Sequence, residues 1–99
     1  MLGLEFYDKV EKRMNKKYMK TYYGAGIKGY FNIEKVSMSM ITNVKDALIY
    51  ITIKWGIEEH DNTRMHEFVV HNRIKNVKQL CDALYTAMNE YEMRGEDTI

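Results

Sequence analysis

The segment ALIYITIKW, residues 47–55, decides the fold class of this 99-residue chain. Apolar and polar side chains alternate along it, so that one face of an extended strand would carry Ile49, Ile51, Ile53 and Trp55. β-Branched and aromatic residues favour strands because they pack well on a pleated surface. The segment therefore predicts a strand whose odd-numbered side chains lie in the core.

Extended segments flank this strand on both sides. Residues 64–71, RMHEFVVH, follow a polar loop at 58–63 and place His66, Phe68 and Val70 on one side. Upstream, the apolar residues are odd-numbered at first and even-numbered later: Ile27, Phe31 and Ile33, then Val36, Met38 and Met40. One regular strand cannot place both sets on one face, so a turn or bulge is expected within 32–35. Residues 27–42 then form one bent strand or a hairpin, in a sheet of three or four strands.

Helical periodicity precedes and follows the sheet region. Residues 4–21 repeat apolar side chains at about 100° per residue, in the stripe Leu4, Tyr7, Val10, Met14, Tyr18 and Thr21, and glycines at 24 and 26 end that helix. Near the C-terminus, Asn76 and Gln79 form an N-cap and capping-box pair, and Gly95 is expected to end the helix. The apolar stripe of this helix consists of Val77, Leu80, Cys81, Leu84, Ala87, Met88 and Tyr91.

These segments predict an α+β fold with the whole chain, 1–99, as a single domain. An N-terminal helix, an antiparallel sheet of three or four strands and a C-terminal amphipathic helix follow one another, with helices covering a single-layer sheet. One cysteine cannot form an internal disulfide, and no apolar run approaches the roughly 20 residues of a membrane span. We therefore expect a cytoplasmic protein without a membrane partner.

Charge is unevenly distributed, although the formal net charge is only +1. Residues 1–45 hold nine Lys or Arg against four acids, and residues 46–99 hold six against ten. Such polarity suits steering toward an anion or self-association, so a homo-oligomer is an open alternative.

Three surfaces are candidates for binding. The first is the basic side of the N-terminal helix, with Lys9, Lys12, Arg13, Lys16 and Lys20. The second is the sheet face opposite the core, with Lys28, Tyr30, Tyr50, Lys54 and His71, provided that no helix covers it. The third is the start of the last helix, with Arg73, Lys75 and Lys78. Each surface can also be interpreted as an ordinary solvated face. This interpretation is weaker for the third surface, because basic residues at a helix N-terminus oppose the helix dipole and do not stabilise the helix.

No combination of residues indicates catalysis or a cofactor. Cys81 falls inside an apolar stripe and is expected to be a packed, inert thiol. His66 and His71 have opposite parity in one strand, so no zinc site with His60 is expected. Glu11 is a lone carboxylate at the edge of its stripe, expected to reach water. We therefore expect neither an enzyme nor a metal or cofactor site.

The order helix, three strands, helix resembles the double-stranded-RNA-binding domain, which uses basic residues at the start of its second helix. The histidine-bearing loop and the dense lysine cluster of that family are missing here. The chain is also similar in size and lack of motifs to the α+β inhibitors that phages and mobile elements encode, including anti-CRISPR proteins. The expected function is a small inhibitor or binding protein that occupies the surface of a protein partner. A nucleic-acid-binding module that uses the basic patches is the alternative.

Overall fold

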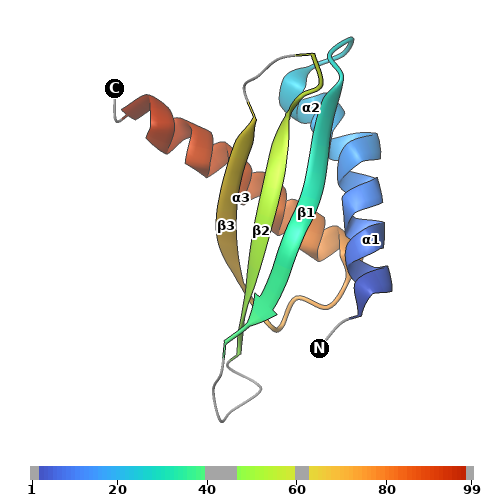
Figure 1. The fold of residues 1–99 in the computed structure, drawn as a ribbon, viewed down its shortest axis with the longest axis vertical. Coiled ribbons are helices and arrows are strands. Elements are labelled where there is room, and N and C mark those ends of the chain that lie inside the picture. The colour runs from blue at the N-terminus through green and yellow to red at the C-terminus, as the bar shows by residue number, and fades with distance from the viewer. Residues whose placement is uncertain (1–2, 40–46, 60–62, 98–99) are drawn as a thin grey trace.

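A computed structural model of the chain describes residues 3–39, 47–59 and 63–97. The elements are α1 (Leu4–Arg13), the π-helical segment η1 (Met14–Tyr18), α2 (Met19–Tyr23), β1 (Gly29–Met38), β2 (Leu48–Ile57), β3 (Arg64–His71) and α3 (Val77–Asp97). The strands form one antiparallel sheet in the order β1-β2-β3 (Figure 1). The predicted α+β order is confirmed, and three of the expected three or four strands lie in the described residues.

The central strand β2 provides the middle of the core, as its alternation predicts. Ile51, Ile53 and Trp55 are fully buried, and Ile49 is 3% exposed. On the same side, β1 contributes Phe31 and β3 contributes Phe68 and Val70. Each of the three strands therefore contributes apolar side chains to the inner face of the sheet.

The expected irregularity in the first extended segment is a β-bulge. The β1–β2 register runs evenly from Gly29 to Ile33 and resumes at Lys35, so Glu34 is the extra residue. One inserted residue reverses the parity of the rest of the strand, which lets Ile33 and Val36 both pack against the core. Residues 29–38 are thus one bulged strand rather than a hairpin. Ile27 precedes this strand and is exposed, and Met40 lies outside the described residues.

The N-terminal helix differs from the continuous α-helix that its stripe predicts. The segment η1 has a longer turn, so the side chains after it fall on a different face from the one that a 3.6-residue period gives. Met19 is buried and Thr21 is exposed as a result. Leu4, which starts the predicted stripe, is 90% exposed because it lies at the free end of α1. Gly24 ends α2 at a φ of 97°.

The closing helix α3 begins as predicted, and its apolar stripe is packed into the core. The Asn76 side-chain oxygen accepts a 2.7 Å hydrogen bond from the backbone N–H of Gln79, which is the expected N-cap. The expected end at Gly95 is wrong, since α3 continues to Asp97. A glycine inside a helix costs only about 1 kcal/mol relative to alanine, so it does not by itself end one.

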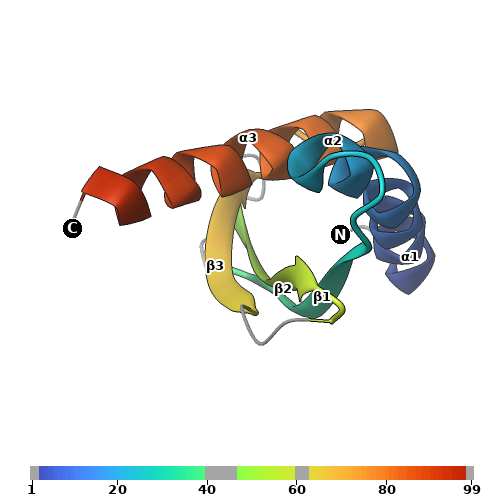
Figure 2. The same cartoon turned by 90° about the horizontal axis from the view of Figure 1, so that it is seen from above.

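The helices lie on one face and one edge of the sheet. α3 crosses the inner face, while α1, η1 and α2 pack along β1 (Figure 2). Asn15 of η1 binds the outer edge of β1: its Nδ2 donates to the Phe31 carbonyl at 2.8 Å, and its Oδ1 accepts from the Phe31 N–H at 2.9 Å. Glu11 accepts a further, longer bond from the Ile33 N–H at 3.4 Å. Two helical side chains thus replace a fourth strand over this part of β1.

Candidate binding surfaces

The outer face of the sheet is open to solvent, because no described element packs against it (Figures 1 and 2). The strand registers place on it Tyr30, Asn32, Lys35 and Ser37 of β1, Leu48, Tyr50, Thr52 and Lys54 of β2, and Met65, Glu67, Val69 and His71 of β3. We call this set the open face. Three of its apolar residues are exposed: Met65 at 63%, Val69 at 51% and Leu48 at 36%.

The apolar residues of the open face are neighbours rather than scattered. Val69 lies directly opposite Tyr50 in the β2–β3 ladder, and Leu48 lies two residues before Tyr50 on the same side of β2. Met65 lies opposite Lys54, so a basic side chain flanks the apolar group. Val69, Tyr50 and Leu48 therefore form one continuous patch, and the Glu67–Thr52 pair separates Met65 from it.

Of the residues expected on this surface, Tyr30, Tyr50, Lys54 and His71 lie on the open face. Tyr30 spans β1 and β2 near one end of the sheet, where its hydroxyl lies 2.5 Å from Thr63 Oγ1. Its ring passes over Gly56, at which a Cβ atom would come within 3.2 Å of it. Lys28 instead lies before β1 and lines a hollow with Lys20 and the 25–27 turn.

Leu48, Met65 and Val69 are exposed residues that the sequence interpretation did not select. The alternation in the sequence could have indicated them. Leu48 lies on the same side of its strand as Tyr50, and Met65 and Val69 lie on the same side of theirs as His71. Alternation alone cannot show which apolar side chain stays exposed, since that depends on whether a helix covers the face.

The basic side of the first helix is only partly free. Lys9 pairs with Glu5 at 3.6 Å and Lys12 with Asp8 at 3.1 Å, each across one helical turn. Lys16 and Lys20 are exposed, and so is Lys17, which was not among the predicted residues.

Arg13 departs from the prediction that it points away from the core. It is half-buried, and its Nε atom is inaccessible to solvent and has no hydrogen-bond partner. The reason is tertiary: α1 packs against α3, so the side of α1 next to α3 is covered although it is polar in sequence.

At the start of α3, one of the three predicted basic residues forms an ion pair and the other two are exposed. Lys78 pairs with Asp82 at 2.9 Å, and Tyr18 of η1 donates to the same carboxylate at 2.6 Å. The Tyr18 bond first, and the Lys78 bond second, hold the pKa of Asp82 below its usual value. Arg73 and Lys75 are exposed.

The structure places the first predicted surface beside the start of α3. A hollow of about 690 Å³ is lined by Lys9, Lys12, Arg13, Lys16 and Lys17 and by Val77 at the start of α3. We call these lysines and Arg13, together with Lys78, the basic strip. Acidic residues lie within it, because Asp8 and Asp82 pair with two of its lysines.

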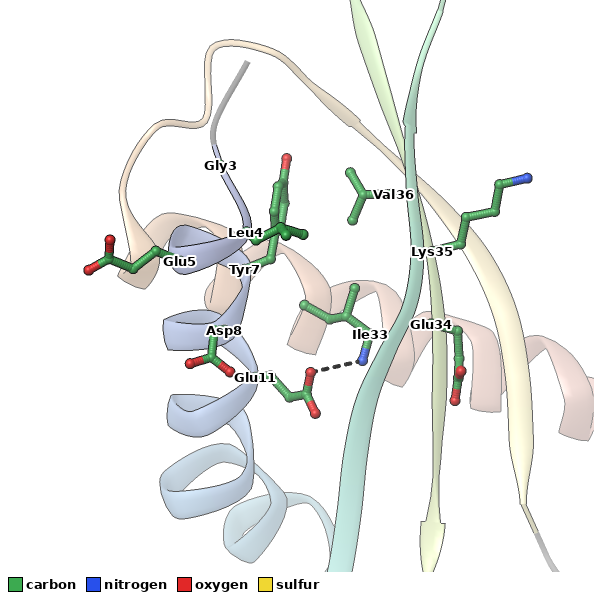
Figure 3. Close-up of a pocket in the computed structure, with 10 residues that line it drawn as sticks. All are labelled: Gly3, Leu4, Glu5, Tyr7, Asp8, Glu11, Ile33, Glu34, Lys35 and Val36. Carbon is green, nitrogen blue, oxygen red and sulfur yellow. Dashed lines mark hydrogen bonds between the residues drawn. The ribbon is translucent and has the colours of Figure 1, made fainter.

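A second hollow, of about 820 Å³, lies between the first turns of α1 and the bulged part of β1 (Figure 3). Leu4, Tyr7, Ile33 and Val36 point into the gap, whereas Lys35 points away from it. The Tyr7 hydroxyl is buried without a hydrogen-bond partner. Glu11, which the sequence places at the edge of the apolar stripe, is half-buried here and accepts a hydrogen bond from the β1 edge.

Among the described residues, Cys81, His66 and His71 lie apart from one another, and His60 lies outside the described ranges. Cys81 is fully buried and lies 3.7 Å from the Val10 carbonyl, and burial raises the pKa of its thiol to about 11. His66 stacks on Tyr91 with a centroid distance of 4.6 Å, whereas His71 belongs to the opposite face. Over residues 3–39, 47–59 and 63–97, no group of three or more His, Cys, Asp or Glu could hold a metal ion. No helix in these ranges is long and apolar enough to cross a membrane.

Comparison with family models, with curated proteins and with solved structures finds no match to the chain. The fold and the surfaces therefore define its class by themselves. It is a small α+β fold of the order helix, three antiparallel strands, helix, with one helix-covered sheet face and one open face.

Proposed function

We propose that this chain is a non-catalytic binding protein that occupies the surface of a partner protein through its open face. The open face supports this because its apolar residues Leu48, Tyr50 and Val69 are contiguous, and Lys35 and Lys54 flank them. Contiguous exposed apolar residues with a polar rim are typical of protein-binding sites. The matching partner surface is apolar at its centre and carries carboxylates at its rim.

Occupation of a surface requires no reaction centre, and the buried Cys81 and the separated histidines supply none. In this function the protein acts as an inhibitor when the covered surface is the partner's own binding site. An inhibitor of a host nuclease, as phages and mobile elements encode, is one form of this proposal. Its readout is loss of nuclease activity on addition of the purified protein.

The test is a double variant, Leu48→Thr with Tyr50→Thr, which removes apolar area from the open face and keeps the β-branching that strands favour. Affinity for a captured partner is expected to fall at least tenfold, about 1.4 kcal/mol. The matched control is Ile27→Thr, since Ile27 is 42% exposed but lies before β1. Equal partner binding by the double variant and the wild type would refute this function.

A second candidate function, nucleic-acid binding, rests on the basic strip, where α1 and the adjoining η1 contribute four lysines to one hollow. Replacement of Lys16 and Lys17 by Gln spares Arg13, which is half-buried, and the ion-paired Lys9 and Lys12. If the strip binds phosphates, this variant weakens duplex binding regardless of sequence and reduces the salt slope by about 0.9 per lost contact. The carboxylates of Asp8 and Asp82 within the strip disfavour phosphate, so the protein-binding function is preferred.

A further inference from the structure

The outer edge of β3 presents unpaired backbone groups. The Asn72 N–H donates to the Ala47 carbonyl at 3.1 Å, which fixes the alternation of the β2–β3 ladder. Counting back from this pair, the N–H and C=O groups of Met65, Glu67 and Val69 point away from β2, as does the N–H of His71. No described strand lies beyond β3, so within residues 3–39, 47–59 and 63–97 this edge has no strand partner (Figure 1).

The two edges of the sheet are protected differently. The β1 edge is bound by Asn15 and Glu11 and is interrupted by the bulge at Glu34. Between residues 64 and 71, β3 contains no proline, lysine or bulge, and its charged residues are limited to Arg64 and Glu67. The β3 edge is therefore ready to accept another strand.

We propose that this strand is β3 of a second copy of the chain, paired antiparallel about a twofold axis at Val69. The two sheets then form one six-stranded sheet. The pairing uses the edge and leaves Leu48, Tyr50 and Lys54 of the open face exposed, whereas Val69 and His71 belong to both surfaces.

Near the middle of β3 the twofold axis could lie at Glu67, Phe68 or Val69. The side chains distinguish among these three registers. An axis at Glu67 would place two like charges opposite each other. An axis at Phe68 would run through α3, because Tyr91 of α3 packs against His66 and Phe68 on the inner face. With the axis at Val69 the two glutamates do not face each other. The α3 helices of the two copies then lie on opposite sides of the axis.

The Val69 register is also self-complementary. Val69 meets its own copy, and Glu67 lies opposite His71 of the second copy on the same face. The His71 Nδ1 accepts a hydrogen bond from the Arg73 N–H at 3.0 Å, so in the neutral ring Nε2 carries the proton and can donate to that carboxylate. The backbone adds two bonds between the Val69 residues and two from His71 N–H groups to Glu67 carbonyls.

The last turns of α3 project past β3, toward the position of the second copy (Figures 1 and 2). Met93 on this projection is 63% exposed. A second copy would cover apolar area there, in addition to the strand edge. The interface is nevertheless of modest size, so a dissociation constant in the micromolar range is expected.

Cysteine cross-linking tests the register directly. In Val69→Cys the two thiols meet at the axis, at about 5.5 Å between Cα atoms, which is within the range of a disulfide. The variant is expected to form a disulfide-linked dimer under mild oxidation, because the native Cys81 is fully buried and does not compete. The matched control is Met65→Cys, which is similarly exposed but lies opposite residue 73. Cross-linking of the control, or none in Val69→Cys, would overturn the register.

Sedimentation velocity over a range of concentrations tests the dimer itself. The wild type is expected to show a reversible monomer–dimer equilibrium, and Val69→Lys a monomer with an unchanged circular dichroism spectrum. Ile27→Lys, a substitution at an exposed residue before β1, is expected to dimerise like the wild type. A wild type that stays monomeric at every concentration overturns the proposal.

Discussion

At the scale of single residues, Cys81 shows how packing determines reactivity. Its side chain belongs to the apolar stripe of α3 and is fully buried, with the Val10 carbonyl 3.7 Å from the sulfur. Removal from water disfavours the thiolate, so the pKa of the thiol rises to about 11. A thiolate is the reactive form, and at neutral pH the folded protein holds almost none.

We predict that a water-soluble thiol reagent labels Cys81 slowly in the native protein and rapidly in denaturant. The measurement is the time course of thiol release or mass shift with and without denaturant. A rate in the native protein equal to that of the unfolded chain would mean that the thiol is accessible, and would restore it as a possible nucleophile.

At the scale of elements, the first helix and β1 depend on each other through Asn15. A strand edge beside a helix has backbone groups that lose water, and the Asn15 amide supplies both a donor and an acceptor to Phe31. The Tyr18 hydroxyl similarly ties η1 to Asp82 of α3. These few polar contacts fix how the helices sit against an otherwise apolar core.

We predict that Asn15→Ala lowers the free energy of unfolding by about 1 to 3 kcal/mol, because two partly buried backbone groups lose their partner. The control is Asn89→Ala, since the Asn89 side chain also donates to a backbone carbonyl, that of Tyr85, but is exposed. Its expected cost is within about 0.5 kcal/mol. Equal midpoints in urea for the two variants would contradict the role of Asn15 as an edge cap.

At the scale of the whole molecule, burial of tyrosines links folding to alkaline pH. Burial raises the pKa of Tyr23 to about 12 and that of Tyr22 further, and both rings pack against the core. In the unfolded chain these hydroxyls ionise near pH 10. The stability that they contribute is complete below pH 10 and is lost as the pH rises through their folded-state pKa values.

We predict that the urea midpoint is steady from pH 7 to 9 and falls from pH 10 upward. Tyr23→Phe removes one ionisation that the unfolded state undergoes first, so its decline with pH should be shallower than that of the wild type. An identical pH profile for the two proteins would show that Tyr23 is not protected in the folded state.

The sequence by itself determined the secondary structure order, the inward face of β2, an irregularity within 32–35, the N-cap of α3 and the burial of Cys81. Each follows from a local pattern, because alternation, parity and capping act between near neighbours in the chain. Only the tertiary structure decided that the outer sheet face is open, that Arg13 is half-buried beside α3, and that Lys17 and Val77 line one hollow. These depend on which helix covers which surface and on the phase shift at η1, and packing between distant segments sets both.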